Sequence, residues 1–120
     1  MTTAIASVAE TSPPNLTEKL SGEHTGGRYS ICEIILRPRE GVGPYAHPQR
    51  SVWFYVLKGE FLFQVDGKRH LFRAGASLRI PPGSVHFFVN CGRTAGTLLA
   101  MTDPAAAPKK NPSAPPGSAW

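Results

Sequence analysis

Short runs of β-branched and aromatic residues fill the middle of the chain, from residue 28 to residue 103, and glycine, proline, asparagine and aspartate separate them. No run carries the 3.6-residue period of an amphipathic helix, so the runs predict β-strands. Between two runs, Asp66 and Gly67 supply the two positive-φ residues that a tight type I′ hairpin needs. Short, evenly spaced strands without helices predict an all-β fold, an antiparallel β-barrel or jelly roll. The predicted strands are residues 28–37, 52–57, 61–65, 68–72, 77–80, 85–90 and 97–101.

Alternation along two of these strands predicts which side chains point into the fold. The residues expected to point inward are Val52, Phe54, Val56, His86 and Phe88. The residues expected to point outward are Trp53, Tyr55, Leu57, Val85, Phe87 and Val89. Both faces are therefore apolar, and a barrel of this size cannot cover its own outer face. We predict that a second copy of the chain covers it, which makes the protein a homodimer.

The composition divides the chain of 120 residues into one folded domain and two flanking segments. Residues 28–103 form the predicted barrel. Residues 1–27 are rich in threonine, serine, alanine and glycine and are expected to form a flexible N-terminal arm. Residues 104–120 contain five of the twelve prolines and are expected to be a flexible tail. The last four residues, 117–120, resemble the start of an affinity tag and are left out of functional reasoning.

Charge and hydropathy exclude several classes of partner. The net charge is +5 and the pI is about 9.6, but the thirteen lysines and arginines are scattered without a nucleic-acid-binding motif, so no nucleic-acid partner is predicted. No apolar stretch approaches the roughly 20 residues of a membrane span. The first residues lack a basic lead and a continuous apolar run, which predicts a cytoplasmic protein. Cys32 and Cys91 lie in no redox motif and are expected to be reduced and packed.

The sequence resembles the cupins in two places. Gly75-x5-Pro81-x-Gly83-x2-His86-x3-Asn90 matches the second cupin signature at every fixed position. The first cupin signature is Gly-x5-His-x-His followed, after three or four residues, by Glu-x6-Gly. Laid over the segment that ends at Gly59, it places Tyr45 at its first histidine, His47 at its second and Val52 at its glutamate. The chain is therefore identified as similar to small single-domain cupins, which implies a cupin-type jelly roll with its site inside the barrel.

The resemblance also implies a degenerate metal site. In metal-binding cupins, the histidines and glutamate of the first signature bind one divalent ion together with the histidine of the second. In this sequence only two of these four positions hold a metal-binding residue, His47 and His86. Val52 cannot bind a metal, and Tyr45 would have to bind as a phenolate. Gln49 could approach only if the loop that carries it shifted. We therefore expect either no cofactor or a weakly held divalent ion: iron, manganese, nickel or zinc.

Three functions remain open for such a site, which is expected to take a small-molecule ligand or substrate. Tyr45, His47 and His86 could act as organic acids and bases in a metal-independent isomerase, cyclase or lyase, which is the hypothesis we favour. A metal-dependent, dioxygenase-like cupin would use His47 and His86 as ligands. A cupin that binds a ligand without catalysis is the third possibility. The residues expected to contact the bound molecule are Gln49, Arg50, Val52, Phe54, Gln64 and Phe88, with Glu33 as a further candidate.

Overall fold

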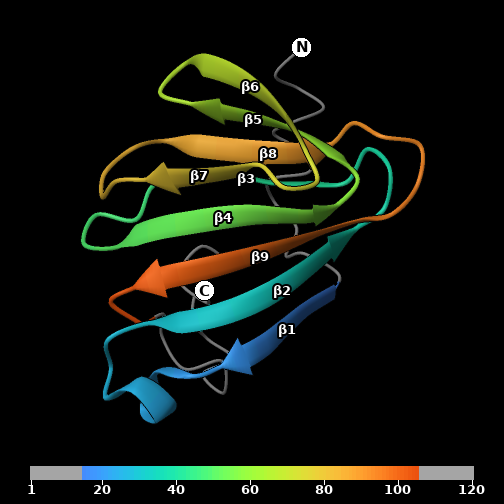
Figure 1. Ribbon diagram of the computed structural model, residues 1–120. Coiled ribbons are helices and arrows are strands. Elements are labelled where there is room, and N and C mark those ends of the chain that lie inside the picture. The colour runs from blue at the N-terminus through green and yellow to red at the C-terminus, as the bar shows by residue number, and fades with distance from the viewer. Residues whose placement is uncertain (1–14, 106–120) are drawn as a thin grey trace.

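The computed structural model describes residues 15–105, which fold into two packed antiparallel sheets (Figure 1). One sheet has the strand order β1-β2-β9-β4-β7, and the other has the order β3-β8-β5-β6. The all-β jelly-roll prediction is confirmed. No helix in this part of the chain is long and apolar enough to cross a membrane. The elements are β1 (Asn15–Leu20), the 3-10 helix η1 (Gly22–Thr25), β2 (Ser30–Leu36), β3 (Gly41–Tyr45), β4 (Ser51–Lys58), β5 (Glu60–Val65), β6 (Lys68–Arg73), β7 (Ser77–Ile80), β8 (His86–Asn90) and β9 (Gly96–Asp103).

The seven predicted strands are all present, with ends that shift by a few residues. The predicted hairpin between β5 and β6 is also present, with φ of 48° at Asp66 and 84° at Gly67. Both values lie in the left-handed region that a type I′ turn requires. Local turn chemistry therefore fixed the β5–β6 register, in which Val65 pairs with Lys68.

Two strands were missed, and one of them lies in the predicted arm. β1 pairs with β2 at the edge of its sheet and directs Leu16 toward the core, opposite Ile34, so the folded part begins before residue 28. An edge strand buries only one face and carries a weak sequence signal. β3 contains Gly41, Gly43 and Pro44, residues that are depleted in strands. The remaining arm residues 1–14, and the tail and tag-like end beyond residue 105, lie outside the described residues.

The core lies between the sheets and contains the residues predicted to point inward, whereas Phe87, predicted to point outward, is also buried, at 9% exposure. Val52, Phe54 and Val56 of β4 are each 1% exposed, and Phe88 of β8 is fully buried. The phenylalanine rings from both sheets contact one another, with 5.0 Å between the centroids of Phe54 and Phe88 and 5.1 Å between those of Phe63 and Phe88. The interior is therefore aromatic as well as aliphatic, and a polar side chain placed among these rings loses its water.

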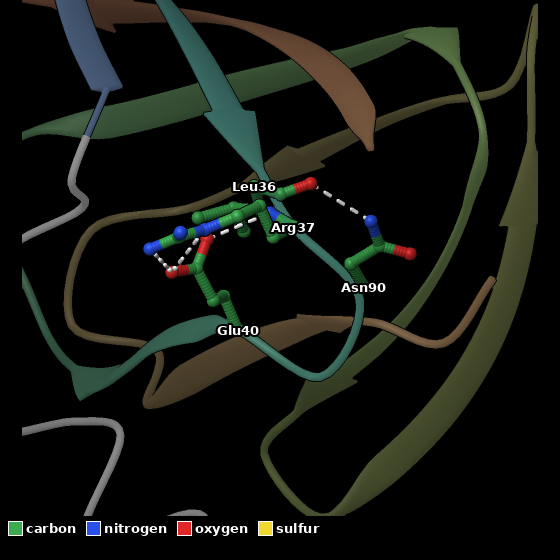
Figure 2. Close-up of polar contacts among 4 residues, drawn as sticks. All are labelled: Leu36, Arg37, Glu40 and Asn90. Atoms are coloured by element: carbon green, nitrogen blue, oxygen red, sulfur yellow. Dashed lines mark hydrogen bonds and ion pairs between the residues drawn. The ribbon is translucent and has the colours of Figure 1, made fainter. Parts of the chain in front are cut away.

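Asn90 closes the end of β8 through its side chain. Its Nδ2 donates to the carbonyl oxygens of Leu36, at 2.8 Å, and Thr94, at 2.9 Å, and its Oδ1 accepts from the backbone N–H of Gly92 at 2.8 Å. Figure 2 shows the amide directed at Leu36, where β2 ends. One buried side chain thus joins the end of β2 to the loop between β8 and β9.

The outer face of the five-stranded sheet carries the apolar side chains that led to the homodimer prediction. Trp53 and Tyr55 of β4 stack with 5.7 Å between their ring centroids, and Met101 and Leu99 of β9 lie beside them in register. We expect light scattering to give twice the chain mass of 12.9 kDa at micromolar concentration. Leu99→Glu should lower that mass to a single chain while the β-sheet circular dichroism is retained. A monomer mass for the unmodified protein would contradict the prediction.

Candidate functional site

Tyr45, His47 and His86 lie together at one end of the space between the sheets. Tyr45 is the last residue of β3 and pairs in register with His86, the first residue of β8, while His47 follows β3 in the loop toward β4. The ring centroids of His47 and His86 are 5.8 Å apart, and those of Tyr45 and His47 are 6.3 Å apart. The Tyr45 hydroxyl and the Nε2 atoms of both histidines are buried. The structure therefore brings together the three residues that the sequence singled out.

The turn Pro81–Ser84 holds both histidines. The backbone N–H of Gly83 donates to the carbonyl oxygen of His47 at 2.9 Å. The carbonyl oxygen of Ser84 lies 3.2 Å from Nδ1 of His86 and can only accept, so Nδ1 carries the proton of this hydrogen bond. Nε2 of a neutral His86 is then unprotonated, and it is buried without a hydrogen-bond partner among residues 15–105. His86 consequently presents a basic lone pair to the interior.

All three groups are neutral near pH 7. The pKa of His47 is lowered to about 4, mainly by burial and in addition by its proximity to His86 and to the Arg50 guanidinium. Burial also lowers the pKa of His86, but the hydrogen bond to Ser84 and the charge of Asp66 act in the opposite direction. Burial raises the pKa of the Tyr45 phenol. The two imidazoles thus differ in their surroundings: a carboxylate favours protonation of His86, and a guanidinium opposes protonation of His47.

Apolar side chains form the wall beside the imidazoles. The ring of Phe54 meets His86 edge-on with 6.1 Å between centroids, and Phe88 packs against Phe54. Val52 points inward on the same face of β4 as Phe54. A molecule bound next to His86 would therefore meet one polar side and one apolar side.

Four other predicted positions lie at the edge of this group or away from it. Arg50 is half-buried in the loop that follows His47, and Gln49 is exposed in the same loop. Gln64 does not reach the interior, because it lies on the outer face of β5, where its Oε1 accepts from Nε of Arg69 at 3.1 Å. Glu33 also points outward and forms an ion pair with Lys19 at 3.5 Å. We leave Gln64 and Glu33 out of the candidate site.

One buried polar pair escaped the sequence analysis. The hydroxyls of Ser30 and Thr102 form a 2.6 Å hydrogen bond inside the fold, and Thr102 pairs in register with Val52. Ser30 also lies in register with Thr102, so the three inward side chains form one row across β2, β9 and β4. The sequence offered little signal for this pair, because Thr102 lies one residue beyond the predicted strand 97–101.

Comparison with known proteins places the chain in a family. The model of the cupin domain matches residues 32–102. The chain belongs to the cupin family. Polyketide synthase CurC of Streptomyces cyaneus is 31% identical over 72 residues, which are 60% of this chain and 47% of CurC. Mannose-1-phosphate guanylyltransferase of Escherichia coli is 29% identical over 76 residues, which are 63% of this chain and 16% of that enzyme. This cupin thus spans less than half the length of these two relatives.

A solved structure gives the same fold at higher coverage. The crystal structure of a predicted oxalate decarboxylase from Thermotoga maritima superposes with a TM-score of 0.71 and 27% identity, over 73% of this chain and 77% of that one. The family match and this superposition confirm the cupin family and the jelly-roll fold predicted from the sequence.

The residues present do not fit the metal centre that the cupin signatures imply. No group of three or more histidine, cysteine, aspartate or glutamate side chains suited to a metal ion occurs among residues 15–105. Val52, at the position of the signature's glutamate, is buried and offers no ligand atom. Two imidazoles supply too few ligands for a tightly bound resident ion, which takes three or more protein ligands. We assign no chemical step to a metal in this cupin.

Restoring a carboxylate at position 52 tests this interpretation. We expect Val52→Glu to bind Mn²⁺ or Zn²⁺ at least tenfold more tightly than the unmodified protein, because it adds an anionic ligand to two imidazoles. Without metal the same variant should be less stable, since it buries an unpaired carboxyl group. Calorimetric titration with each metal measures the affinity, and Val52→Gln is the size-matched control without charge. One equivalent of metal retained by the unmodified protein after chelation would contradict the interpretation.

Proposed function

We propose that this cupin is a metal-independent enzyme that performs acid–base chemistry on a small carbonyl-bearing molecule. The reaction class is an isomerisation, a cyclisation or a lyase-type elimination. The observation that carries the proposal is the buried, unprotonated Nε2 of His86, held in that state by the Nδ1 hydrogen bond to Ser84, on a residue that pairs across the strands with Tyr45. A neutral base next to a neutral acid, in surroundings that exclude water, is the combination that removal of a proton beside a carbonyl requires.

The roles follow from the electrostatic differences between the groups. Nε2 of His86 takes a proton from the carbon next to the substrate carbonyl, and the C–H electron pair moves toward the carbonyl oxygen to form an enolate. The charge of Asp66 favours the imidazolium that results. The Tyr45 hydroxyl donates a hydrogen bond to the enolate oxygen, and its raised pKa keeps it protonated for that purpose. His47, with a pKa of about 4, stays neutral and positions the substrate.

The enolate can then react in one of three ways without an added reactant. His86 can return the proton to a different carbon, which is an isomerisation. The enolate carbon can attack a second carbonyl carbon of the same molecule, which closes a ring, and the alkoxide takes the proton from His86. In an elimination, the enolate electron pair forms a C=C bond to the next carbon, and a leaving group on that carbon departs with its bonding pair and takes the proton from His86. The phenylalanine rings beside His86 suit an apolar or aromatic portion of the substrate.

A relative supports the choice of a carbonyl-rich substrate. CurC is named as a polyketide synthase. Polyketides carry carbonyl groups on alternate carbons, and the C–H groups between two carbonyls lose a proton readily. Such C–H groups are acidic enough for a buried imidazole, which is a weak base, to deprotonate. The resulting enolate can attack a second carbonyl carbon of the same molecule and close a ring. Among the three reactions, cyclisation therefore has the most support.

Proton exchange tests the proposal without knowledge of the natural substrate. A panel of aryl ketones and aryl 1,3-diketones is incubated in D₂O near neutrality with chelator, and loss of the α-proton signal is followed by NMR. We expect catalysed exchange with at least one compound. Tyr45→Phe and His86→Gln should each lower the rate about a hundredfold or more, in the range typical for loss of a general acid or base. His24→Gln alters an exposed histidine outside the barrel and serves as the control.

Two outcomes would overturn the proposed function. If chelator abolished the exchange and a divalent ion restored it, the metal-dependent alternative would be correct. Tight binding of panel compounds without exchange would make it a ligand-binding cupin.

A further inference from the structure

The turn Pro81–Ser84 between β7 and β8 touches the backbone of one histidine and the ring of the other. Gly83 N–H donates to the carbonyl oxygen of His47 at 2.9 Å, and the carbonyl oxygen of Ser84 accepts from Nδ1 of His86 at 3.2 Å. The turn is itself closed by a 3.3 Å hydrogen bond from Ser84 N–H to the carbonyl oxygen of Pro81. Four residues thus connect the β3–β4 loop, which carries His47, to the first residue of β8.

We infer that this turn is the positioning element of the site: it selects the tautomer of His86 and sets the separation of the two imidazoles. The inference rests on the proposed function only for the use of the Nε2 lone pair. Gly83 and Ser84 act through the histidines and touch no substrate, so they are positioning residues. No side chain of the turn is needed for this role, because both contacts come from the backbone.

The tautomer follows from what each ring nitrogen faces. A carbonyl oxygen has no proton to give, so the bond to Ser84 forms only when Nδ1 of His86 is protonated. If the turn moved away, neither nitrogen would have a fixed partner, and the proton could reside on Nε2. His86 would then present an N–H to the interior instead of a lone pair, and it could not accept a proton there.

The conformation of Gly83 makes the turn sensitive to a single substitution. Its φ is +85°, in the left-handed region, and a Cβ at this position would meet no atom within 4 Å. Gly83→Ala therefore adds backbone strain without a steric clash, and the strain is relieved by movement of the turn. The movement weakens both contacts to the histidines together.

Gly75 supplies a matched control, before the start of β7, whereas Gly83 follows its end. Gly75 lies between β6 and β7 with φ of +95° and no atom within 4 Å of an added Cβ. Its N–H donates to the carbonyl oxygen of Val56 at 2.8 Å, just as that of Gly83 donates to His47. Gly75→Ala thus carries the same kind of strain and the same backbone bond, but neither histidine is involved.

Nitrogen NMR of the full-length protein at neutral pH, without substrate, tests the inference. In the unmodified protein we expect the two ring nitrogens of His86 to be widely separated, with Nε2 in the range of an unprotonated nitrogen. In Gly83→Ala the two resonances should move toward each other as the tautomers mix, whereas in Gly75→Ala they should stay in place. The exchange rate of a reactive panel ketone should fall about tenfold or more in Gly83→Ala alone, because a misplaced base loses its alignment.

The outcomes separate this inference from the proposed function. A protonated Nε2 on His86 in the unmodified protein overturns it, and so do unchanged His86 resonances in a folded Gly83→Ala protein. If that variant does not fold, the tautomer of the unmodified protein decides. The expected resonances without proton exchange on any ketone would uphold the role of the turn and contradict the catalytic proposal.

Discussion

Replacing Asn90 with leucine is expected to lower the free energy of unfolding by about 3 to 5 kcal/mol, because it leaves several buried polar groups without partners. Asn90 is completely buried. The substitution keeps the size of the side chain but removes the hydrogen bonds to Leu36, Thr94 and Gly92. The carbonyl oxygen of Leu36 then faces an apolar group inside the fold. Urea denaturation followed by tryptophan fluorescence measures the change.

A neighbouring substitution provides the control. Arg37, drawn beside Asn90 in Figure 2, forms an exposed 3.0 Å ion pair with Glu40. Arg37→Met removes that pair and should cost no more than about 1 kcal/mol, as is usual for ion pairs at the surface. If Asn90→Leu cost no more than the control, the asparagine of the second signature would not be the structural residue described above.

Acidification from pH 7 to pH 4 is expected to remove about 3 kcal/mol of stability through His47 alone, since each pH unit between the unfolded and folded pKa values contributes about 1.4 kcal/mol. The pKa of His47 falls from 6.5 in the unfolded chain to about 4 in the folded protein. Between pH 6.5 and pH 4, His47 is protonated in the unfolded chain but not in the folded protein. The free energy of unfolding therefore decreases as the pH is lowered. Below pH 4 both states are protonated and the loss is complete. The lowered pKa of His86 adds to the effect in the same direction.

Denaturation curves at half-unit steps from pH 7.5 to pH 4 measure this dependence. His47→Gln should flatten the slope between pH 6.5 and pH 4, because the side chain no longer titrates. His24→Gln, which alters an exposed histidine in η1, is measured alongside as the comparison variant. Equal slopes in the unmodified protein and His47→Gln would mean that His47 titrates freely in the folded state.

Strong local signals explain why much of the fold could be predicted from the sequence. The alternation of β4 placed Val52 and Phe54 in the core, and the chemistry of the Asp66-Gly67 turn specified the β5–β6 hairpin. β3 could not be predicted in this way, because it contains a glycine whose role is to lack a side chain where β3 approaches β8 closely. A Cβ on Gly43 would lie 2.7 Å from the carbonyl oxygen of His86, a contact that becomes visible only after β3 and β8 are paired.

The candidate site was predictable to a similar extent. The resemblance to the two cupin signatures implied that Tyr45, His47 and His86 share one site. The prediction that Gln64 contacts a bound molecule was wrong, because the alternation along β5 was not used to assign its inward face. Gln64 lies on the outer face of β5, between the inward Phe63 and Val65. The tautomer of His86 could not be predicted at all, because it depends on a backbone carbonyl two residues away.

The strand β8 has a candidate catalytic residue, His86, at its start and a buried structural residue, Asn90, at its end. His86 and Asn90 are four residues apart, which corresponds to about 13 Å along an extended strand. Substitutions at that distance with no shared partner usually have additive effects on stability. Residues around His86 can therefore be varied by directed evolution with Asn90 held constant. The losses of stability from substitutions at the two positions should add, without a further interaction energy between them. A single short strand gives a protein engineer two separable points of control.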